Sequence, residues 1–94
     1  MVVIASFKDK FSQAFYEGVM VQKWYPIRMQ ISCRLQILDS ATCLNDLKSL
    51  PSNRFKVLKG DRKEQYSIRV NKQWRICFCW KDEGPYAVEI VDYH

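Results

Sequence analysis

The sequence has a single histidine, His94, and no long apolar run. A membrane-spanning helix needs roughly 18 or more consecutive apolar residues, and no segment approaches that length. The apolar start, residues 1–6, is too short for a signal peptide, so we expect a cytoplasmic protein without a membrane partner. The sequence also lacks internal repeats, low-complexity segments, a glycine-rich phosphate loop and a nucleophile elbow. These absences argue against P-loop nucleotide chemistry and serine-hydrolase chemistry.

The cysteines are too poorly spaced to predict a metal site. No Cys-x-x-Cys pair occurs, and Cys77 and Cys79 would point to the same face of a strand, which is poor geometry for tetrahedral zinc. We therefore expect no metal and no cofactor. The cysteines are expected to be small buried side chains in a reducing compartment.

Length and composition predict one folded domain over residues 1–94. A second core would not fit in 94 residues, and 48% hydrophobic content with 14% aromatic residues is typical of a folded globule.

The first part of the sequence predicts helices. Residues 2–4 are expected to form a short strand, and Ser6 and Asp9 to form a capping box for a helix that ends at Gly18. A stripe of aromatic side chains is expected to face the core: Phe7, Phe11 and Phe15. A second helix is expected to start near Pro26. Its buried stripe has steps of four, four and three: Ile27, Ile31, Leu35 and Leu38. A short third helix is expected within residues 44–50.

After Pro51 the hydrophobic period changes from 3.6 to 2, which predicts strands. Residues 54–58 form a weak candidate. Three stronger candidates alternate apolar and polar side chains, and their apolar sets are Tyr66, Ile68 and Val70, then Trp74, Ile76, Phe78 and Trp80, then Tyr86, Val88 and Ile90. Two short polar loops between the three segments predict an antiparallel meander.

Parity predicts the register of the two hairpins. If Ile68 and Ile76 share the core face, a three-residue loop over 71–73 sets them opposite one another. A five-residue loop over 81–85 then sets Ile76 opposite Ile90.

The same register sets Arg69 opposite Arg75 and brings the end of the chain toward Arg75. Like charges directly opposite one another destabilise a sheet by up to about 1 kcal/mol. Either a bound anion compensates for this repulsion, or the two side chains splay apart into water.

Positive charge is concentrated in residues 54–75. This segment has eight basic and two acidic residues, a net charge of +6, whereas the rest of the chain has a net charge of −1. The basic residues are Arg54, Lys56, Lys59, Arg62, Lys63, Arg69, Lys72 and Arg75. Such a cluster is either a solvated face or the binding site of a polyanion.

The chain ends on a carboxylate, a phenol and an imidazole: Asp92, Tyr93 and His94. Terminal residues often fray and carry no function. Here, however, the preceding strand is strongly apolar, and histidine titrates close to neutral pH. Beside cations that hold phosphate, these groups could act as a metal-free ribonuclease, with acid and base groups moving protons and cations stabilising the phosphate charge.

Three blocks identify a family resemblance: Arg-Phe-Lys-Val-Leu-Lys-Gly-Asp-Arg over 54–62, Tyr-Ser-Ile-Arg-Val-Asn over 66–71, and Gln-Trp-Arg-Ile-Cys-Phe over 73–78. With the terminal Ile-Val-Asp-Tyr-His over 90–94 and Leu-Asp-Ser-Ala-Thr over 38–42, they resemble the HigB toxins (plasmid maintenance killer proteins) of the RelE/ParE superfamily. The resemblance implies an α+β fold with N-terminal helices packed on a twisted antiparallel sheet. It implies an endoribonuclease that cuts mRNA on the ribosome and is neutralised by a helix-turn-helix antitoxin, HigA.

The resemblance also implies residue roles. Arg75 would stabilise the scissile phosphate, and Asp92, Tyr93 and His94 would supply acid, base or alignment roles. Lys59 and Arg62 would hold the RNA or ribosomal RNA backbone. The remaining basic side chains of the segment are expected to contribute to the same contacts: Arg54, Lys63, Arg69 and Lys72.

One position departs from the family pattern. Some HigB toxins carry a histidine where this chain has Lys56. A lysine is ordinarily protonated at neutral pH, which makes it a weak base there, though it is a good electrostatic stabiliser. Either His94 is then the only titrating group of the reaction, or the enzyme is slow. We expect Lys56 to contribute to catalysis without replacing a histidine, and the toxin to be comparatively mild.

Two other functions are compatible with these residues. The chain could be a weakly catalytic or non-catalytic nucleic-acid binder that acts mainly as its antitoxin's partner and co-repressor, or a toxin with a protein target such as gyrase. The terminal Asp-Tyr-His favours the ribonuclease.

Overall fold

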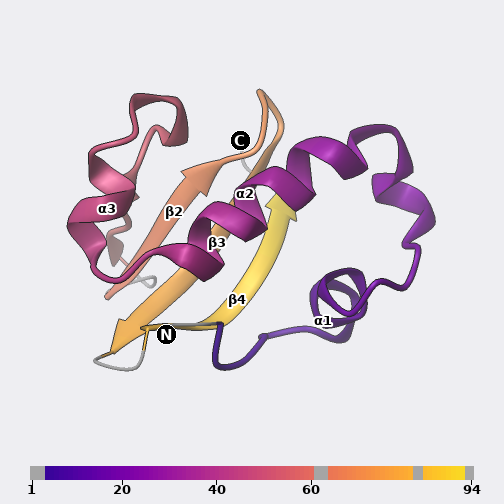
Figure 1. Cartoon of the computed structure of the whole chain (residues 1–94), viewed down its shortest axis with the longest axis horizontal. Helices are drawn as coiled ribbons and strands as arrows, with labels where there is room; N and C mark the ends of the chain where they lie inside the picture. Colours follow the sequence, from indigo (N-terminus) through magenta and orange to yellow (C-terminus); the bar gives the residue numbers. More distant parts are fainter. Residues whose placement is uncertain (1–3, 61–63, 82–83, 93–94) are drawn as a thin grey trace.

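Helices occupy the first half of the chain, and a four-stranded antiparallel sheet occupies the second (Figure 1). The computed structural model describes residues 4–60, 64–81 and 84–92. The helices are α1 (Lys10–Tyr16), the 3-10 helix η1 (Gln22–Ile27), α2 (Arg28–Ser40), α3 (Leu44–Lys48) and the 3-10 helix η2 (Pro51–Asn53). The strands pair in sequence order and are β1 (Lys56–Val57), β2 (Gln65–Arg69), β3 (Trp74–Lys81) and β4 (Gly84–Asp92).

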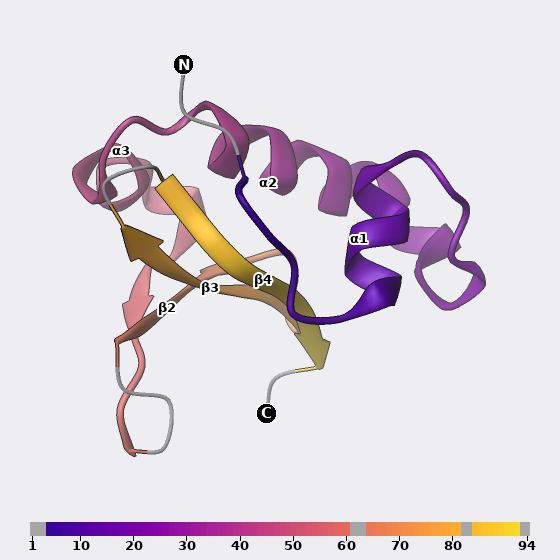
Figure 2. The ribbon, with the colours of Figure 1, turned by 90° about the horizontal axis from the view of Figure 1, so that it is seen from below.

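The helices lie on one side of the sheet. Helices α2 and α3 cover one face, α1 lies beside β4, and no described helix covers the opposite face (Figure 2). This arrangement confirms the expected α+β fold. None of the helices within the described residues has both the length and the apolar character needed to cross a bilayer.

The segment before α1 runs alongside β4. Ala5 N–H donates to the Pro85 carbonyl at 2.8 Å, and Lys8 N–H donates to the Val88 carbonyl at 2.9 Å. Of the strand expected over residues 2–4, residues 2 and 3 lie outside the described residues, and Ile4 is not in a strand.

The predicted cap of α1 was wrong. Asp9 is the N-cap, and its carboxylate accepts the Ser12 N–H at 3.2 Å. The hydroxyl of Ser6 instead accepts the Ala87 N–H at 3.0 Å. Backbone N–H groups of β4 need hydrogen-bond acceptors, and the Ser6 hydroxyl is the acceptor for one of them.

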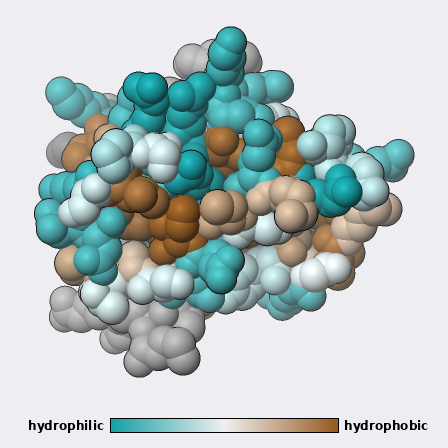
Figure 3. All heavy atoms as spheres, turned by 45° about the horizontal axis from the view of Figure 1, so that its top comes forward, coloured by the Kyte–Doolittle hydropathy of each residue, from teal (hydrophilic) through white to brown (hydrophobic). Residues whose placement is uncertain are grey.

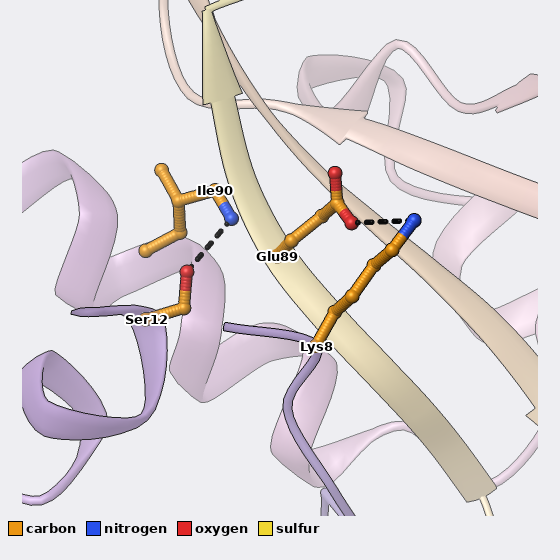
Figure 4. A network of polar contacts seen from close by, with 4 residues as sticks. All are labelled: Lys8, Ser12, Glu89 and Ile90. Carbon is orange, nitrogen blue, oxygen red and sulfur yellow. Dashed lines mark hydrogen bonds and ion pairs between the residues drawn. The ribbon is translucent and has the colours of Figure 1, made fainter. Parts of the chain in front are cut away.

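The predicted aromatic stripe of α1 was only partly right. Phe7 and Phe15 pack against the core, but Phe11 is 49% exposed. The fully buried residue of α1 is Ser12, whose Oγ accepts the Ile90 N–H at 3.0 Å (Figure 4). The need to satisfy a β4 donor therefore turns this short helix so that Phe11 faces solvent.

Helix α2 supplies the predicted stripe, and Ile31, Leu35 and Leu38 are buried. The helix begins two residues later than expected, because the segment containing Pro26 forms η1 instead. The predicted third helix is confirmed as α3.

The first sheet hairpin confirms the predicted register. Ile68 pairs with Ile76, and Arg69 pairs with Arg75. The Val70 N–H donates to the Trp74 carbonyl at 2.9 Å, which closes the three-residue loop.

The second hairpin confirms the register at its open end but not the predicted loop. Ile76 pairs with Ile90, as expected, yet Lys81 pairs with Gly84, so only two residues connect the strands. An extra β4 residue between Tyr86 and Glu89 makes up the difference. Ala87 there adopts φ 52°, a left-handed conformation typical of a β-bulge. The bulge pairs Tyr86 with Cys79, so Tyr86 does not share the face of Val88 as predicted.

Candidate functional site

The sheet face opposite α2, called here the open face, carries three of the predicted site residues. Lys56 pairs with Ser67 across β1 and β2, and Arg69 pairs with Arg75 across β2 and β3. Ser67 pairs in turn with Cys77, the second residue after Arg75. Paired residues, and residues two apart on a strand, project from the same face. The open face therefore brings Lys56, Arg69 and Arg75 together, and parity had predicted the shared face of the two arginines.

Arg75 is held in place by neighbours on the open face. Its side chain is only 6% exposed, and its Nε donates to the Ser67 hydroxyl at 2.8 Å. Its Nη2 donates to the carbonyl oxygens of Arg54 and, at 3.4 Å, Ser67. Guanidinium stays charged in proteins, and the planar fork gives these hydrogen bonds a defined direction. The result is a positive charge with a set orientation under the open face.

The turn before β1 positions the carbonyl that Arg75 uses. Arg54 adopts φ 44° at the end of η2, a left-handed conformation that is uncommon for a residue with a side chain. Beside it, the fully buried Asn53 donates from Nδ2 to the Leu47 carbonyl at 3.1 Å and accepts from Arg34 Nη1 at 2.7 Å. These contacts anchor the turn, so the main chain of Arg54 serves Arg75 while its side chain remains exposed.

Sequence reasoning missed Ser67, Asn53 and Arg34. The parity that placed Arg69 and Arg75 on one face also places Ser67 there, so the signal for Ser67 was present. No local pattern marked Asn53 or Arg34, because their bond joins residues 19 positions apart.

Asp92 does not lie on the open face. It pairs with Trp74, whose ring contacts Trp24 on the helix side at a centroid distance of 6.0 Å. Its Oδ2 accepts from Gln73 Nε2 at 2.9 Å, which ties the end of β4 to the loop before β3. The neighbouring predicted residues, Tyr93 and His94, lie outside the described residues.

The remaining cations are distributed along the length of β2. Lys59 is exposed just after β1, whereas Lys72 is exposed in the loop beyond the other end of β2. Arg69 is half-buried, and its Nε donates to the Asn71 carbonyl at 3.0 Å. Arg62 and Lys63 lie outside the described residues. This distribution suits an extended anion better than a single small one.

The cysteines are not uniformly buried as expected. Cys77 is buried and Cys79 half-buried, but Cys33 and Cys43 are exposed.

Tyr86 lies next to Cys79 on the neighbouring strand. Burial raises the pKa of Tyr86, and Cys79 and Glu64 add to the rise. Its phenol is therefore protonated at neutral pH.

Residues 5–94 match a family described as RelE-like toxin of type II toxin-antitoxin system HigB. Toxin HigB-1 of Vibrio cholerae serotype O1 is 44% identical over 78 residues, which cover 81% of this chain and 82% of that protein. Endoribonuclease HigB of Proteus vulgaris is 34% identical over 97 residues, which cover 98% of this chain and 100% of that protein.

Solved structures share the fold. The YoeB–YefM complex from Staphylococcus aureus contains a chain that matches with a TM-score of 0.63 at 19% identity, over 100% of this chain and 98% of that one. The YoeB/ParE toxin from Agrobacterium tumefaciens matches with a TM-score of 0.54 at 14% identity, over 99% of each chain. At these identities the likeness concerns the fold alone.

Proposed function

Since this chain belongs to the RelE-like HigB toxins of type II toxin–antitoxin systems, we propose that it is a ribosome-dependent endoribonuclease that cleaves mRNA by metal-free acid–base chemistry. A HigA-type helix-turn-helix antitoxin is its proposed inhibitor. The observation that carries the proposal is the oriented Arg75 guanidinium on the same face as Lys56. The 34% identical Proteus vulgaris relative, named as an endoribonuclease, supports the reaction class.

In the proposed reaction, the 2′-oxygen of a nucleotide attacks the adjacent phosphorus. A base takes the 2′-hydroxyl proton, the bond from phosphorus to the 5′-oxygen breaks, and an acid gives that oxygen a proton. The products are a 2′,3′-cyclic phosphate and a free 5′-hydroxyl. Negative charge gathers on the phosphate oxygens in the transition state, where an oriented cation is most effective.

Residue roles follow from chemistry and position. Arg75 and Lys56 would stabilise the charge on the phosphate. His94, the single imidazole of the chain, and Tyr93 would move protons. Asp92 would align the chain end that carries them, since its carboxylate is bound to Gln73 rather than turned to the open face.

The other basic residues of the 54–75 segment are proposed to hold the RNA or ribosomal backbone: Arg54, Lys59, Arg62, Lys63, Arg69 and Lys72. Phosphate contacts of this kind make binding fall steeply with salt.

The test is a cleavage assay with the purified chain, translating ribosomes and a defined mRNA, in which new 5′ ends are mapped. We expect Arg75→Ala and His94→Ala each to lower the cleavage rate by about 100-fold or more. Lys10→Ala removes an exposed charge from α1 and serves as the control. Full cleavage by both site variants would mean that the site is wrong. Salt-sensitive RNA binding by the wild-type chain without any cleavage would instead identify a non-catalytic binder.

A further inference from the structure

A group of exposed apolar side chains surrounds the junction of α1, η1 and α2. We call it the Met20 patch, and it consists of Phe11, Val19, Met20, Tyr25 and Met29. Met20 is 68% exposed and Met29 75% exposed, which are high values for large apolar residues. Hydrophobic side chains also reach the surface over the helical side in the space-filling view (Figure 3). Exposed apolar groups gathered in this way are typical of a contact surface.

The Met20 patch is hollowed rather than flat. A depression of about 330 Å³ lies between residues 18–21 and the start of α2, and its lining includes Phe15, Val21 and Met29. Two neighbouring depressions of about 410 and 510 Å³ also include Met20 in their walls. Flexible methionine side chains between adjacent hollows can adapt to the apolar side chains of a partner.

Positive charge borders the patch. The bordering cations are Lys23 of η1 and Arg28 at the start of α2. Lys23 Nζ lies 4.8 Å from the centroid of the Phe11 ring, and Arg28 Cζ lies 3.9 Å from that of Tyr25. The cations are thus held against the aromatic rings of the patch itself.

We propose that the Met20 patch is the docking surface for an amphipathic helix of the antitoxin, a helix whose apolar face is flanked by aspartate or glutamate. Apolar side chains at successive turns would enter the hollows, and carboxylates would pair with Lys23 and Arg28. The identification of the partner as the antitoxin rests on the proposed function.

The chemistry of the patch favours a protein helix over other occupants. RNA would need open aromatic faces for stacking, but Lys23 and Arg28 each cover a ring. Aliphatic side chains such as Val19 and Met20 also offer nothing to a phosphate. A second copy of this chain, seated patch to patch, would bring like charges together, which opposes association.

The patch and the open-face cations occupy different parts of the molecule. Helix α1 lies beyond β4, whereas β2 lies on the other side of β3 (Figures 1 and 2). Substitutions in the patch can therefore be tested for partner binding and RNA cleavage separately.

The experiment uses the full chain and, as the probe, the protein encoded by the adjoining reading frame, with affinity measured by calorimetry. We expect Met20→Glu and Met29→Glu each to weaken binding by about tenfold or more. The control is Val57→Glu, which adds the same charge at an exposed apolar residue of β1, 56% exposed, and should change affinity less than about twofold. Thermal unfolding of each variant checks that the fold is intact.

Several outcomes would overturn the docking proposal. They are an absence of binding by the wild-type chain, unchanged affinity of both methionine variants, or an equal loss in Val57→Glu. Sedimentation showing that Met20→Glu separates a homodimer while partner binding is unchanged would assign the patch to self-association instead. RNA cleavage without the partner is measured in parallel and should be retained by both methionine variants. If the wild-type chain binds through the patch but never cleaves RNA, the proposed function fails while the docking surface stands.

Discussion

Arg69 and Arg75 face each other directly across β2 and β3, yet their side chains turn away from one another. Arg69 Nε donates to the carbonyl of Asn71, beyond the end of β2, whereas Arg75 reaches back to Ser67 and to the carbonyl of Arg54. Hydroxyl and carbonyl oxygens thus offset a repulsion of up to about 1 kcal/mol. The two side chains therefore splay apart, which was one of the two outcomes expected from the sequence.

The orientation of Arg75 predicts that Ser67 is a positioning residue. Ser67→Ala removes the acceptor of Arg75 Nε at 2.8 Å but keeps the charge. We expect the cleavage rate to fall by about tenfold, with little change in RNA affinity, because a misdirected cation stabilises the transition state less well. Single-turnover cleavage and RNA binding measure the two effects. Ser40→Ala, an exposed serine at the end of α2, is the control, and an equal loss in both variants would contradict the role of Ser67.

We predict that one substitution at Lys56 increases activity. We expect Lys56→His to raise the cleavage rate at pH 7 by about tenfold, because imidazole exchanges protons near neutral pH and ammonium does not. The pH–rate profile of the variant should gain one titration near pH ~6.5 in addition to those of the wild-type chain. A variant with an unchanged rate and profile would show that this position acts through charge alone.

The contacts of α1 and its preceding segment with β4 predict unequal contributions to stability. Ser12→Ala leaves the buried Ile90 N–H without its acceptor and should lower the free energy of unfolding by about 1–3 kcal/mol. Lys8→Ala breaks the 3.2 Å ion pair with Glu89, but Lys8 is 53% exposed, so the loss should stay below about 1 kcal/mol (Figure 4). Urea denaturation of both variants provides the comparison. Equal losses would contradict this ranking.

The bulge in β4 predicts opposite effects of two substitutions at Ala87. Its φ of 52° suits glycine, so Ala87→Gly should relieve strain and stabilise the fold by up to about 1 kcal/mol. Ala87→Val places a branched side chain in the same conformation and should destabilise the fold by more than about 1 kcal/mol. Thermal unfolding tests both. If Ala87→Gly proved no more stable than Ala87→Val, the left-handed conformation would be in doubt.

Tyr16 predicts a stability change at alkaline pH. Burial, and then the hydrogen bond and charge of Asp39, raise the pKa of Tyr16 above its ordinary value. The folded state therefore favours the protonated phenol, and this stabilisation is present below pH ~10 and lost as pH rises through the folded pKa.

Difference absorbance titration against Tyr16→Phe isolates this phenol from the other tyrosines. Asp39→Asn should lower the pKa of Tyr16, because it removes the carboxylate that opposes phenolate formation. A pKa unaffected by Asp39→Asn would contradict the contact.

Elements with a regular period were predictable from sequence. The stripe of α2, at Ile31, Leu35 and Leu38, follows from helical spacing alone, and the Ile68–Ile76 pair follows from alternation and the short loop. The length of the loop between β3 and β4 was less predictable. The bulge at Ala87 adds a residue to β4, so the loop is shorter than the predicted 81–85.

The candidate site was likewise predictable from the sequence only in part. Parity alone placed Arg69 and Arg75 on one face, but it did not show that Arg75 is buried against the Arg54 carbonyl. Asp92 was expected near Arg75. It lies one residue past Val91, which pairs with Arg75, so strand alternation turns Asp92 toward the helix side.

The amino-acid sequence by itself determined the family, the helical first half and stranded second half, the register of the first hairpin and the gathering of positive charge along β2. These properties depend on neighbours in the chain, through periodicity, turn length and composition. Only the tertiary structure decided which side of α1 is buried and where the Arg75 guanidinium points. Both depend on polar groups distant in sequence, such as Ser12 and Ile90, 78 positions apart. Buried donors and acceptors must find partners wherever the fold brings them together, and no local pattern encodes that choice.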